Sequence, residues 1–464
     1  MTDGRLALVT PERRWTAGQL SDAVARETER LDAAGVRDGS VDRVAFDAHA
    51  TAESIVRLLA LFEMGVCVAP QHPRIAAAER ARRLEMLAPV LDLDAPGTRI
   101  VRGTARAGGE TRWSRRPGSD PGEAKQAILF TSGSSGTPRA VVLSRRAFRS
   151  AAEASGAHLG WEPDDRWLCC LPLAHVGGLS IVVRCTTAGR PIVLTGGFDP
   201  ATIVRVVAEE SVTLASFVPA MLHRLFEAKP DWRAPERLRV ALLGGAAAGP
   251  GLWEEIGRRG LPALATYGMT ESCAQIATGT PAHPRRLVPL PGVDVRVVDG
   301  RIEVGGPTLC TAVGETVPRQ DDGVAGRPDP WTPDGYLRTA DLGRMEDGVL
   351  TVMGRADDVI VTGGENVAPR GVESVLEEHP AVRRAVVFGL PDEQWGALVA
   401  AVLEPSPGTA RPSAAELTEW LRPRLAGFER PRRLGWVEEL PTTPSGKVDR
   451  AAVLELRGRG LEKL

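Results

Sequence analysis

The chain has 464 residues, 43% of them hydrophobic and 25% charged, and a formal net charge of −2. A chain of this length is expected to form more than one domain, and its composition is typical of a soluble globular protein. The near-neutral charge gives no support to a protein that binds nucleic acid or a membrane surface. No window reaches the roughly 18 uncharged apolar residues of a membrane span. The polar N-terminus lacks the apolar core of a signal peptide, so we expect a cytoplasmic protein.

Helical and strand patterns alternate at the start of the chain. Thr16 is predicted to cap a first helix, residues 52–64 to form a second helix, and residues 66–70 to form a short buried strand. Residues 104–124 are rich in Gly, Arg and Pro, and we expect an exposed loop there.

A second unit begins with the apolar run at residues 127–131. Further strands are predicted at 167–172, 192–195, 214–218 and 240–243, and helices between them at 144–157, 201–210 and 250–259. This alternation favours parallel strands with helices on both faces of the sheet. Residues 293–304 alternate apolar and polar around Asp-Gly, which indicates a hairpin, and residues 314–335 read as a loop.

After Gly354 the pattern restarts with a helix at 370–378, strands at 384–390 and 398–403, and a helix at 413–425. We therefore divide the chain into a large domain, residues 1–356, and a small α+β domain, residues 357–464. The six cysteines have neither zinc-ligand nor secreted-framework spacing. Cys169 and Cys170 lie in an apolar run, where buried thiols are expected.

Lysine is scarce, with four residues against 53 arginines (57 Lys+Arg minus 4). One of the four, Lys447, lies in Pro-Ser-Gly-Lys-Val-Asp-Arg, where a compact ammonium can act in ways that a planar guanidinium cannot. Drift on a surface loop is the alternative. The two tyrosines, Tyr267 and Tyr336, both lie in stretches that carry hydroxyls and carboxylates at the ends of predicted strands, where loops often carry function.

The segment Thr131-Ser-Gly-Ser-Ser-Gly-Thr-Pro-Arg139 directly follows a predicted strand. Small residues leave its backbone N–H groups free, and its hydroxyls add donors, so it can surround phosphate oxygens. It lacks the Gly-Lys-[Ser/Thr] ending of a Walker loop, and a simple Gly/Ser turn is the alternative. Tyr267, Glu271, Asp341 and Arg355 supply an aromatic ring and charged groups, which a nucleotide site also needs.

These segments resemble the adenylate-forming superfamily of acyl-CoA synthetases, adenylation domains and luciferases. The resemblance covers nearly the whole chain and rests on five motifs in the expected order: Thr-Ser-Gly-Ser-Ser-Gly-Thr-Pro-Arg, Tyr-Gly-Met-Thr-Glu, Tyr-Leu-Arg-Thr-Ala-Asp, Gly-Arg-Ala-Asp-Asp-Val-Ile-Val-Thr-Gly-Gly-Glu-Asn and Pro-Ser-Gly-Lys-Val-Asp-Arg. It implies an α/β fold, with a large N-terminal domain of mostly parallel sheets flanked by helices and a small β-barrel-like part. A small, mobile α+β C-terminal domain follows.

The resemblance also implies the role of each matching residue. ATP phosphates would meet Thr131, Ser132, Gly133, Ser134, Ser135, Gly136 and Arg139; adenine would lie between Gly244, Gly245, Ala246 and the Tyr267–Gly268 segment; the ribose would bind Asp341 and Arg355. Thr270 would reach the α-phosphate, Glu271 would hold Mg²⁺, and Lys447 would bridge the substrate carboxylate and the α-phosphate. Asp357 would be the hinge, and Gly363 and Gly364 would let the arm of coenzyme A approach. Arg139 replaces the usual lysine of the phosphate segment, and arginine also binds phosphate.

The stretch Leu171-Pro-Leu-Ala-His-Val-Gly-Gly-Leu-Ser-Ile-Val-Val-Arg184 is similar to the o-succinylbenzoate–CoA ligases of menaquinone synthesis. Their substrate keeps an ionised carboxylate on its ring. Arg184 lies in an apolar helical run, where an unpaired charge is costly, so we expect it to pair with that carboxylate or with an Asp or Glu of the protein. His175 is predicted to gate the acyl pocket, with a packed structural histidine as the alternative, and Ser216 to form part of its wall.

The resulting prediction is an ATP- and Mg²⁺-dependent ligase that joins a small carboxylic acid to coenzyme A, with o-succinylbenzoate as the preferred acid. Another aryl- or acyl-CoA ligase, or a free-standing adenylation enzyme that loads a carrier protein, remains open. A degenerate nucleotide-binding protein is the alternative from a different class, although intact Lys447, Glu271, Asp341 and Arg355 argue against it. Oligomeric state also stays open, a homodimer included.

Overall fold

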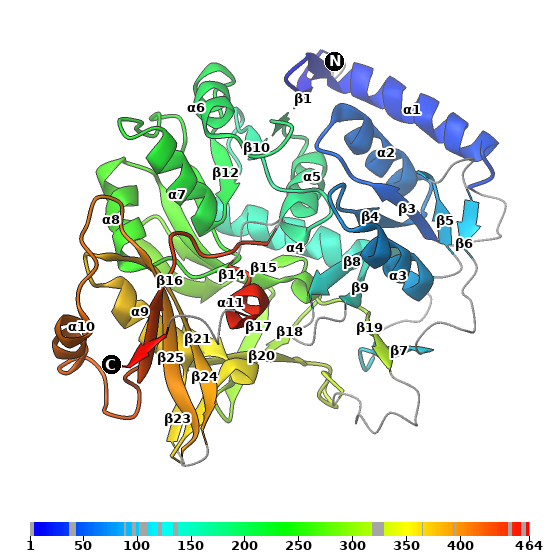
Figure 1. Cartoon of the computed structure of the whole chain (residues 1–464). Helices are drawn as coiled ribbons and strands as arrows, with labels where there is room; N and C mark the ends of the chain where they lie inside the picture. The colour runs from blue at the N-terminus through cyan, green and yellow to red at the C-terminus, as the bar shows by residue number, and fades with distance from the viewer. Residues whose placement is uncertain are drawn as a thin grey trace.

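The computed structural model describes residues 4–36, 43–87, 90–94, 99–101, 110–118, 123–132, 138–317, 329–363, 365–392, 395–443, 448–455 and 461–463. Two large sheets with helices between and around them form most of the molecule, and a smaller unit containing the C-terminal elements packs against one side (Figure 1).

The largest sheet has a parallel centre whose strands are nearly all buried. In spatial order these strands are β14 (Ala263–Met269), β13 (Val240–Leu243), β12 (Leu214–Phe217), β10 (Trp167–Cys169), β11 (Ile192–Leu194) and β1 (Leu6–Val9). Runs such as Val240-Ala-Leu-Leu243, buried at every position, are typical of strands covered on both faces. The prediction of parallel strands alternating with helices is confirmed.

Antiparallel strands extend this sheet to thirteen strands. Beyond β14 lie β15 (Ala274–Thr280), β16 (His283–Pro289), β21 (Val349–Arg355), β20 (Leu337–Glu346), β18 (Arg301–Gly305) and β17 (Asp294–Val298), and β2 (Arg14–Thr16) lies beyond β1. The predicted hairpin is β17–β18, which turns through Asp299 and Gly300, both at positive φ. These strands occupy the place expected for the barrel-like part, as a continuation of the large sheet.

The second sheet has eight strands. In spatial order they are β6 (Arg99–Val101), β5 (Val90–Asp92), β3 (Arg43–Asp47), β4 (Cys67–Gln71), β8 (Lys125–Ser132), β9 (Pro138–Ser144), β19 (Ala312–Val317) and β7 (Glu110–Arg115). The loop predicted at 104–124 is therefore wrong for residues 110–115, which pair with β19, and β19 likewise enters the loop predicted at 314–335. An edge strand with the polar sequence Glu-Thr-Arg-Trp-Ser-Arg lacks the apolar run that marks a buried strand.

Helices fill the space between the sheets and cover their outer faces. They are α1 (Ala17–Ala33), α2 (Ala52–Glu63), α3 (Ala77–Leu87), α4 (Arg145–Leu159), α5 (Val176–Ala188), α6 (Pro200–Glu209), α7 (Pro219–Ala228) and α8 (Pro250–Arg258). One apolar core joins α2, α4 and α5 to both sheets, and a second joins α6, α7 and α8 to the other face of the large sheet. Thr16 caps α1 in a capping box with Gln19, as predicted.

The C-terminal elements have their own apolar cores. After the turn η3 (Ala356–Asp358) they are β22 (Ile360–Thr362), β23 (Glu365–Val367), α9 (Pro369–Glu377), β24 (Val382–Asp392), β25 (Gly396–Pro405), α10 (Ala414–Leu421), β26 (Arg433–Trp436), α11 (Arg450–Glu455) and β27 (Glu462–Lys463). The helices and strands predicted in this region are present, although the helix predicted at 413–425 ends at Leu421.

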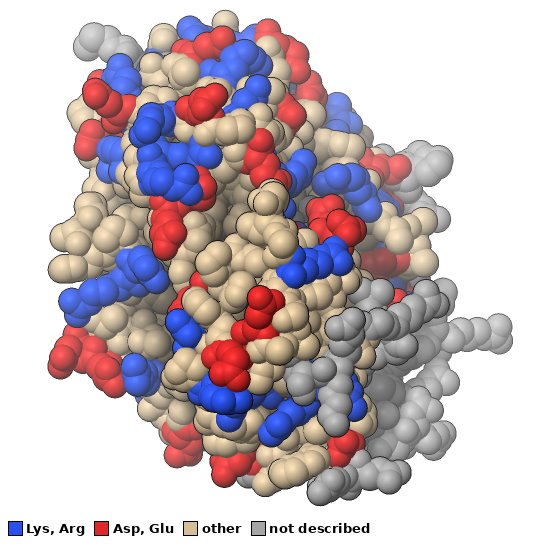
Figure 2. Space-filling view, turned by 60° about the vertical axis from the view of Figure 1, so that its left-hand side comes forward, with Lys and Arg blue, Asp and Glu red and all other residues tan. Residues whose placement is uncertain are grey.

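Charges of both signs are interspersed over the face shown in Figure 2. Across the described ranges, no helix is both long and apolar enough to cross a lipid bilayer. All six cysteines are buried and unpaired with one another, as expected for Cys169 and Cys170.

Candidate active site

The carboxyl ends of the parallel strands bring several predicted site residues to one edge of the large sheet. Ser216 lies in β12, Gly244 follows β13, and Tyr267 lies near the end of β14. The turn η1 (Thr270–Ser272), which contains Glu271, comes directly after β14. In open α/β sheets this edge is the usual place for a ligand.

Tyr267, Asp341 and Arg355 meet, although they are distant in sequence. The Tyr267 hydroxyl donates to Asp341 Oδ2 at 2.7 Å, and Arg355 Nη1 lies 3.5 Å from Asp341 Oδ1. Asp341 and Arg355 are paired in register on β20 and β21. Burial and the neighbouring Asp341 carboxylate raise the pKa of the Tyr267 phenol well above its ordinary value, so this tyrosine stays protonated and keeps donating.

Glycines let the backbone come close at this edge. A Cβ on Gly244 would lie 2.6 Å from Thr266 Cγ2, and a Cβ on Gly268 would lie 1.4 Å from the Ala274 carbonyl oxygen. Gly245 has φ of +79°, and it is exposed together with Ala246. Exposed backbone of this kind, beside Tyr267, leaves room for a flat ligand.

The strands that border the predicted phosphate segment are antiparallel neighbours. Thr131 pairs with Arg139, and Ser132 with Pro138, on β8 and β9. Gly133, Ser134, Ser135 and Gly136 lie outside the described residues. Arg139 Nη1 reaches to 3.9 Å from Glu271 Oε1, so the phosphate segment and the predicted metal ligand adjoin each other.

His175 lies at the start of α5, one end of the predicted acyl pocket. Its ring centroid is 5.7 Å from that of His72, which follows β4 in the other sheet. Burial, with Arg74 and Arg83 nearby, lowers the pKa of His72, which favours the neutral form of this imidazole. A Cβ on Gly178 would lie 2.4 Å from the Pro172 carbonyl oxygen, which explains the glycines that follow His175.

Arg184 and Ser216 both contact Trp167, a β10 residue. Trp167 Nε1 donates to Ser216 Oγ at 3.1 Å, and the Arg184 guanidinium carbon lies 5.4 Å from the Trp167 ring centroid. Arg184 is 3% exposed, and its Nε and Nη2 have no hydrogen-bond partner among the residues that the structure describes. Burial lowers the pKa of Arg184 to about 10, which leaves the side chain charged at neutral pH.

The protein carboxylate expected as the alternative partner of Arg184 is not found. Within the part of the chain that the structure describes, no Asp or Glu lies at ion-pair distance from this guanidinium. A buried charge without a counter-charge is expensive, so this position suits an anion supplied from outside the protein.

The small domain contributes residues from two places. Lys447 lies outside the described residues, in the stretch between Thr443 and Val448. Gly363, at φ +57°, donates its N–H to the Trp395 carbonyl at 2.9 Å, and Gly364 is not described. The backbone of Asp357 lies in η3, between β21 and β22, at the point predicted for the hinge.

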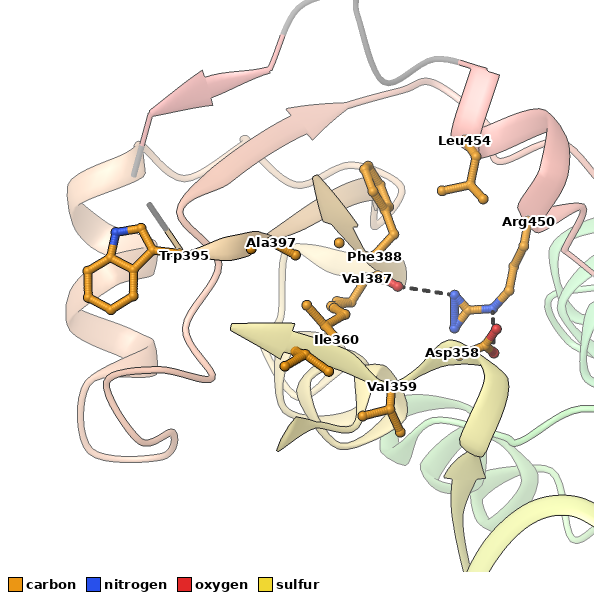
Figure 3. Close-up of a pocket in the computed structure, with 12 residues that line it drawn as sticks. Asp358, Val359, Ile360, Val387, Phe388, Trp395, Ala397, Arg450 and Leu454 are labelled. Carbon is orange, nitrogen blue, oxygen red and sulfur yellow. Dashed lines mark hydrogen bonds and ion pairs between the residues drawn. The ribbon is translucent and has the colours of Figure 1, made fainter. Parts of the chain in front are cut away.

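A pocket of about 540 Å³ lies beside Gly363, within the small domain (Figure 3). Trp395 and Val361 line it near the glycine, and Arg450 at its far end contacts the Val387 carbonyl and Asp358. None of the predicted nucleotide-binding residues lines this pocket, so it is separate from the edge described above.

Sequence analysis missed His72 and Trp167. His72 follows an apolar strand far from the motifs, and no local pattern distinguishes it. Trp167 stands at the start of a strand that reads as core, and its contacts with Ser216 and Arg184 follow from the fold alone.

Comparison with known proteins supports the predicted resemblance. The sequence profile of the AMP-binding enzyme family matches residues 1–317, and that of the AMP-binding enzyme C-terminal domain matches residues 371–447. The 2-succinylbenzoate–CoA ligase of Geobacillus kaustophilus is 33% identical, over 98% of this chain and 96% of that protein.

Two solved structures of o-succinylbenzoate CoA synthetase from Bacillus subtilis are also similar, at 29% identity. The complex with the acyl-adenylate intermediate OSB-AMP has a TM-score of 0.79, over 98% of this chain and 96% of that one. A double mutant bound to the product analogue OSB-NCoA has a TM-score of 0.64, over 100% and 97%. This chain is therefore more similar overall to the acyl-adenylate complex than to the product-analogue complex.

The residues brought together at the sheet edge and the extent of these matches lead to one conclusion. The chain belongs to the AMP-binding enzymes and is an adenylate-forming acyl-CoA ligase.

Proposed function

We propose that the chain is an o-succinylbenzoate–CoA ligase. The substrate carboxylate attacks the α-phosphorus of ATP, and the bond to pyrophosphate breaks to give acyl-AMP. The thiol of coenzyme A then attacks the acyl carbonyl carbon, and AMP leaves. The observation that carries this choice of acid is buried Arg184, whose guanidinium has two nitrogens with no hydrogen-bond partner in the described part of the chain.

Binding and orientation of ATP are assigned to the sheet edge. We assign adenine to the space between Tyr267 and the Gly244–Ala246 backbone, with Gly268 beside it, and the ribose hydroxyls to Asp341 and Arg355. The Tyr267 hydroxyl holds the Asp341 carboxylate in a fixed orientation, ready to accept from a ribose hydroxyl. Thr131, Ser132, Gly133, Ser134, Ser135 and Gly136, with Arg139, are assigned to the phosphates and Thr270 to the α-phosphate.

Glu271 suits a magnesium ion. Mg²⁺ is usually bound by one or two carboxylates together with substrate phosphates and water. A single carboxylate that adjoins the phosphate segment through Arg139 fits that donor set, and among the described residues no larger acidic or histidine cluster competes with it. The bound ion would offset the negative charge of the phosphates.

Lys447 is assigned to the adenylation step, where its ammonium would meet both the attacking carboxylate and the α-phosphate as charge develops. Gly363 and Gly364 are assigned to the approach of coenzyme A. We also propose residues 1–356 and 357–464 as the two domains, joined at Asp357, since one site must serve both steps and the small domain carries groups for each.

The o-succinyl chain and ring are assigned to the space between His175, Ser216 and Arg184. Arg184 would neutralise the ring carboxylate, directly or through water, while His175 and His72 border the entrance. Trp167 fixes both Ser216 and Arg184, so it is a positioning residue for the same subsite.

The experiment is a screen of carboxylic acids for thioester formation with free coenzyme A, ATP and Mg²⁺, with o-succinylbenzoate among them. We expect o-succinylbenzoate to give the highest kcat/KM. A better aryl or alkyl acid would replace the substrate assignment. Pyrophosphate exchange without transfer to free coenzyme A would indicate a carrier-protein acceptor, and the absence of exchange with every acid would indicate a nucleotide-binding protein without ligase activity.

A further inference from the structure

An ion pair connects the large and small domains in this structure. Arg383 Nη1 on β24 lies 2.7 Å from Glu227 Oε1 on α7. The same α7 face presents His223, whose neighbours across the interface include Arg383 and Arg384. Nothing in the proposed reaction uses these residues.

Two neighbouring arginines of the small domain, Arg383 and Arg384, lie at this face. Arg383 and Arg384 share a single carboxylate, Glu404, which is 1% exposed. Glu404 also accepts from the Leu440 N–H at 2.8 Å, a further contact inside its own domain. Arg383 gains a second carboxylate partner, Glu227 of the large domain, only while the two domains are in contact.

A second contact depends on the same arrangement. Glu377 of α9 faces Gly249, just before α8, so closely that a Cβ on Gly249 would lie 2.8 Å from Glu377 Oε2. Figure 1 shows α9 next to the end of the molecule that contains α7 and α8. The ion pair and the glycine contact therefore belong to one docking surface, formed by His223, Glu227 and Gly249 of the large domain with Glu377, Arg383 and Arg384 of the small one.

We propose that Glu227 and Arg383 are positioning residues that hold the small domain in the pose required for adenylation, and so help to decide which of the two half-reactions the enzyme performs. This inference rests on the proposed two-step function. The pose is identified by its similarity, which is greater to the acyl-adenylate complex (TM-score 0.79) than to the product-analogue complex (TM-score 0.64) of the Bacillus subtilis enzyme.

The size of the effect follows from the exposure of the pair. The Glu227 side chain is 45% exposed, so solvent weakens its attraction to Arg383. A contact of this strength changes a ratio of two populations by about two- to fivefold when it is removed. Reversing the charge replaces attraction by repulsion against two arginines, for which we expect about tenfold. Such a bias suits a domain that must leave its pose in every turnover.

The experiment compares Glu227→Lys with the matched control Glu209→Lys. Glu209 is also exposed on a helix of the large domain, and its partner Arg205 lies one turn away on that same helix. We expect Glu227→Lys to slow acyl-adenylate formation by about three- to tenfold relative to the control. Thioester formation from supplied acyl-adenylate should be unchanged or faster. Arg383→Lys, which keeps the charge, should behave like the unmodified enzyme in both half-reactions.

A second readout needs neither substrate nor activity. Spin labels on cysteines introduced at Glu153 of α4 and Glu419 of α10, both exposed, report the distance between the domains. The population at the distance of this structure should fall in Glu227→Lys and stay constant in Glu209→Lys. If the protein forms no acyl-adenylate but the populations shift, the proposed function fails and the docking role stands. Equal populations in the two variants, or equal loss of both half-reactions, would overturn the inference.

Discussion

Arg184 is the residue whose surroundings most restrict the choice of acid. Sequence alone left two partners open, the ring carboxylate or a protein carboxylate, because a helical apolar run does not show what lies across from it. Among the residues that the structure describes, no carboxylate pairs with Arg184, and the Trp167 ring packs against the guanidinium. Because the Arg184 guanidinium is already held in place, it would lose little conformational entropy when the ring carboxylate binds. This favours selectivity for an acid with two carboxylates.

Arg184→Ala should therefore lower kcat/KM for o-succinylbenzoate. The loss should correspond to a free energy of about 2–5 kcal/mol, the usual cost of leaving one member of a buried charge pair alone. The loss should be small for an analogue without the ring carboxylate, and the KM for ATP should hardly change. Steady-state kinetics with both acids measures this.

Stability separates this role from a structural one. Replacing a buried charge that lacks a protein partner with an apolar residue is neutral or stabilising, so Arg184→Met should not lower the midpoint of urea unfolding. Arg239→Ala is the matched control, because Arg239 forms a close ion pair with Asp165, which is fully buried. We expect about 3–5 kcal/mol of destabilisation there. A similar loss in Arg184→Met would make Arg184 a structural residue.

The other site residues show how far residue patterns reach. Tyr267, Asp341 and Arg355 were predicted to share one nucleotide, and they contact each other directly. Motif order could not reveal the hydrogen bond from Tyr267 to Asp341, since that bond depends on β14 and β20 lying in one sheet. His72 and Trp167 carry no motif at all and could be recognised only in three dimensions.

At the scale of elements, strand β14 and its turn depend on close backbone approach. Gly268 faces the Ala274 carbonyl at the bulge between β14 and β15, where the register shifts. Gly268→Ala would place a methyl group inside that carbonyl, so the strands must separate. We expect a loss of at least about 3 kcal/mol in the free energy of unfolding.

Gly257→Ala provides the comparison for Gly268→Ala. Gly257 lies in α8, and a Cβ there meets nothing within 4 Å. Alanine is favoured over glycine inside a helix by about 0.5–1 kcal/mol, so this variant should be slightly more stable. Urea unfolding of both variants tests the argument, and equal stabilities would show that β14 and β15 tolerate the added methyl group.

Apolar periodicity predicted the elements that are buried on both faces and missed those at the edges. Strands β10, β12 and β13 read as apolar runs because helices cover both of their sides. Strand β7 is polar and pairs through its backbone with β19, so its sequence resembles a loop. A strand whose stability comes from hydrogen bonds to a distant segment has no local signal for a sequence pattern to detect.

We propose that the two-step reaction depends on the turn η3. Asp357→Pro fixes φ and removes a backbone N–H at the predicted hinge, and this should restrict rotation of the small domain. Because the pose in this structure resembles the acyl-adenylate complex, pyrophosphate exchange should survive in this variant while thioester synthesis collapses. Asp357→Ala, which keeps the N–H and a free φ, is the control. Unchanged overall turnover in Asp357→Pro would place the hinge elsewhere.

At the scale of the whole molecule, the orientation of the small domain could not be predicted from the sequence. It depends on contacts such as Glu227 with Arg383, which join exposed side chains far apart in the chain and resemble ordinary surface charges until the domains are seen together. The motifs predict which residues of the small domain act in each half-reaction. In our proposal, surface charges such as Glu227 and Arg383 help to set the population of each domain orientation.

Two groups at the docking surface have pKa values that are shifted in opposite directions, so we expect opposite effects of pH on docking. Burial, with Arg383 and Arg384 nearby, lowers the pKa of His223 to about 3. Burial also raises the pKa of Glu377 to about 7, although Arg370 and Arg384 oppose the shift. Glu227 lies one turn along the same helix as His223, and both Glu227 and Glu404 of β25 contact Arg383.

The sign of each contribution follows from linkage between docking and proton binding. A released His223 has an ordinary pKa near 6.5, so its contribution to docking is complete above that pH and is lost as the pH falls below it. A released Glu377 has an ordinary pKa near 4.3, so its contribution is complete below that pH and is lost as the pH rises toward 7. Between about pH 4.5 and 6.5, docking therefore moves a proton from His223 to Glu377 with little net uptake.

We therefore expect the docked population of the unmodified protein to vary little between pH 5.5 and 7, as measured with the two spin labels. In two variants, Glu377→Gln and His223→Asn, the docked population should vary with pH in opposite directions. In Glu377→Gln only His223 titrates, and the ratio of docked to released protein should fall as the pH is lowered, by up to about tenfold at one unit below the released pKa. In His223→Asn only Glu377 titrates, and the ratio should rise as the pH is lowered. Each variant controls for the other, because both remove one titrating group from the same surface and keep a neutral polar side chain. Slopes of the same sign, or none in either variant, would mean that neither group changes its exposure when the small domain moves.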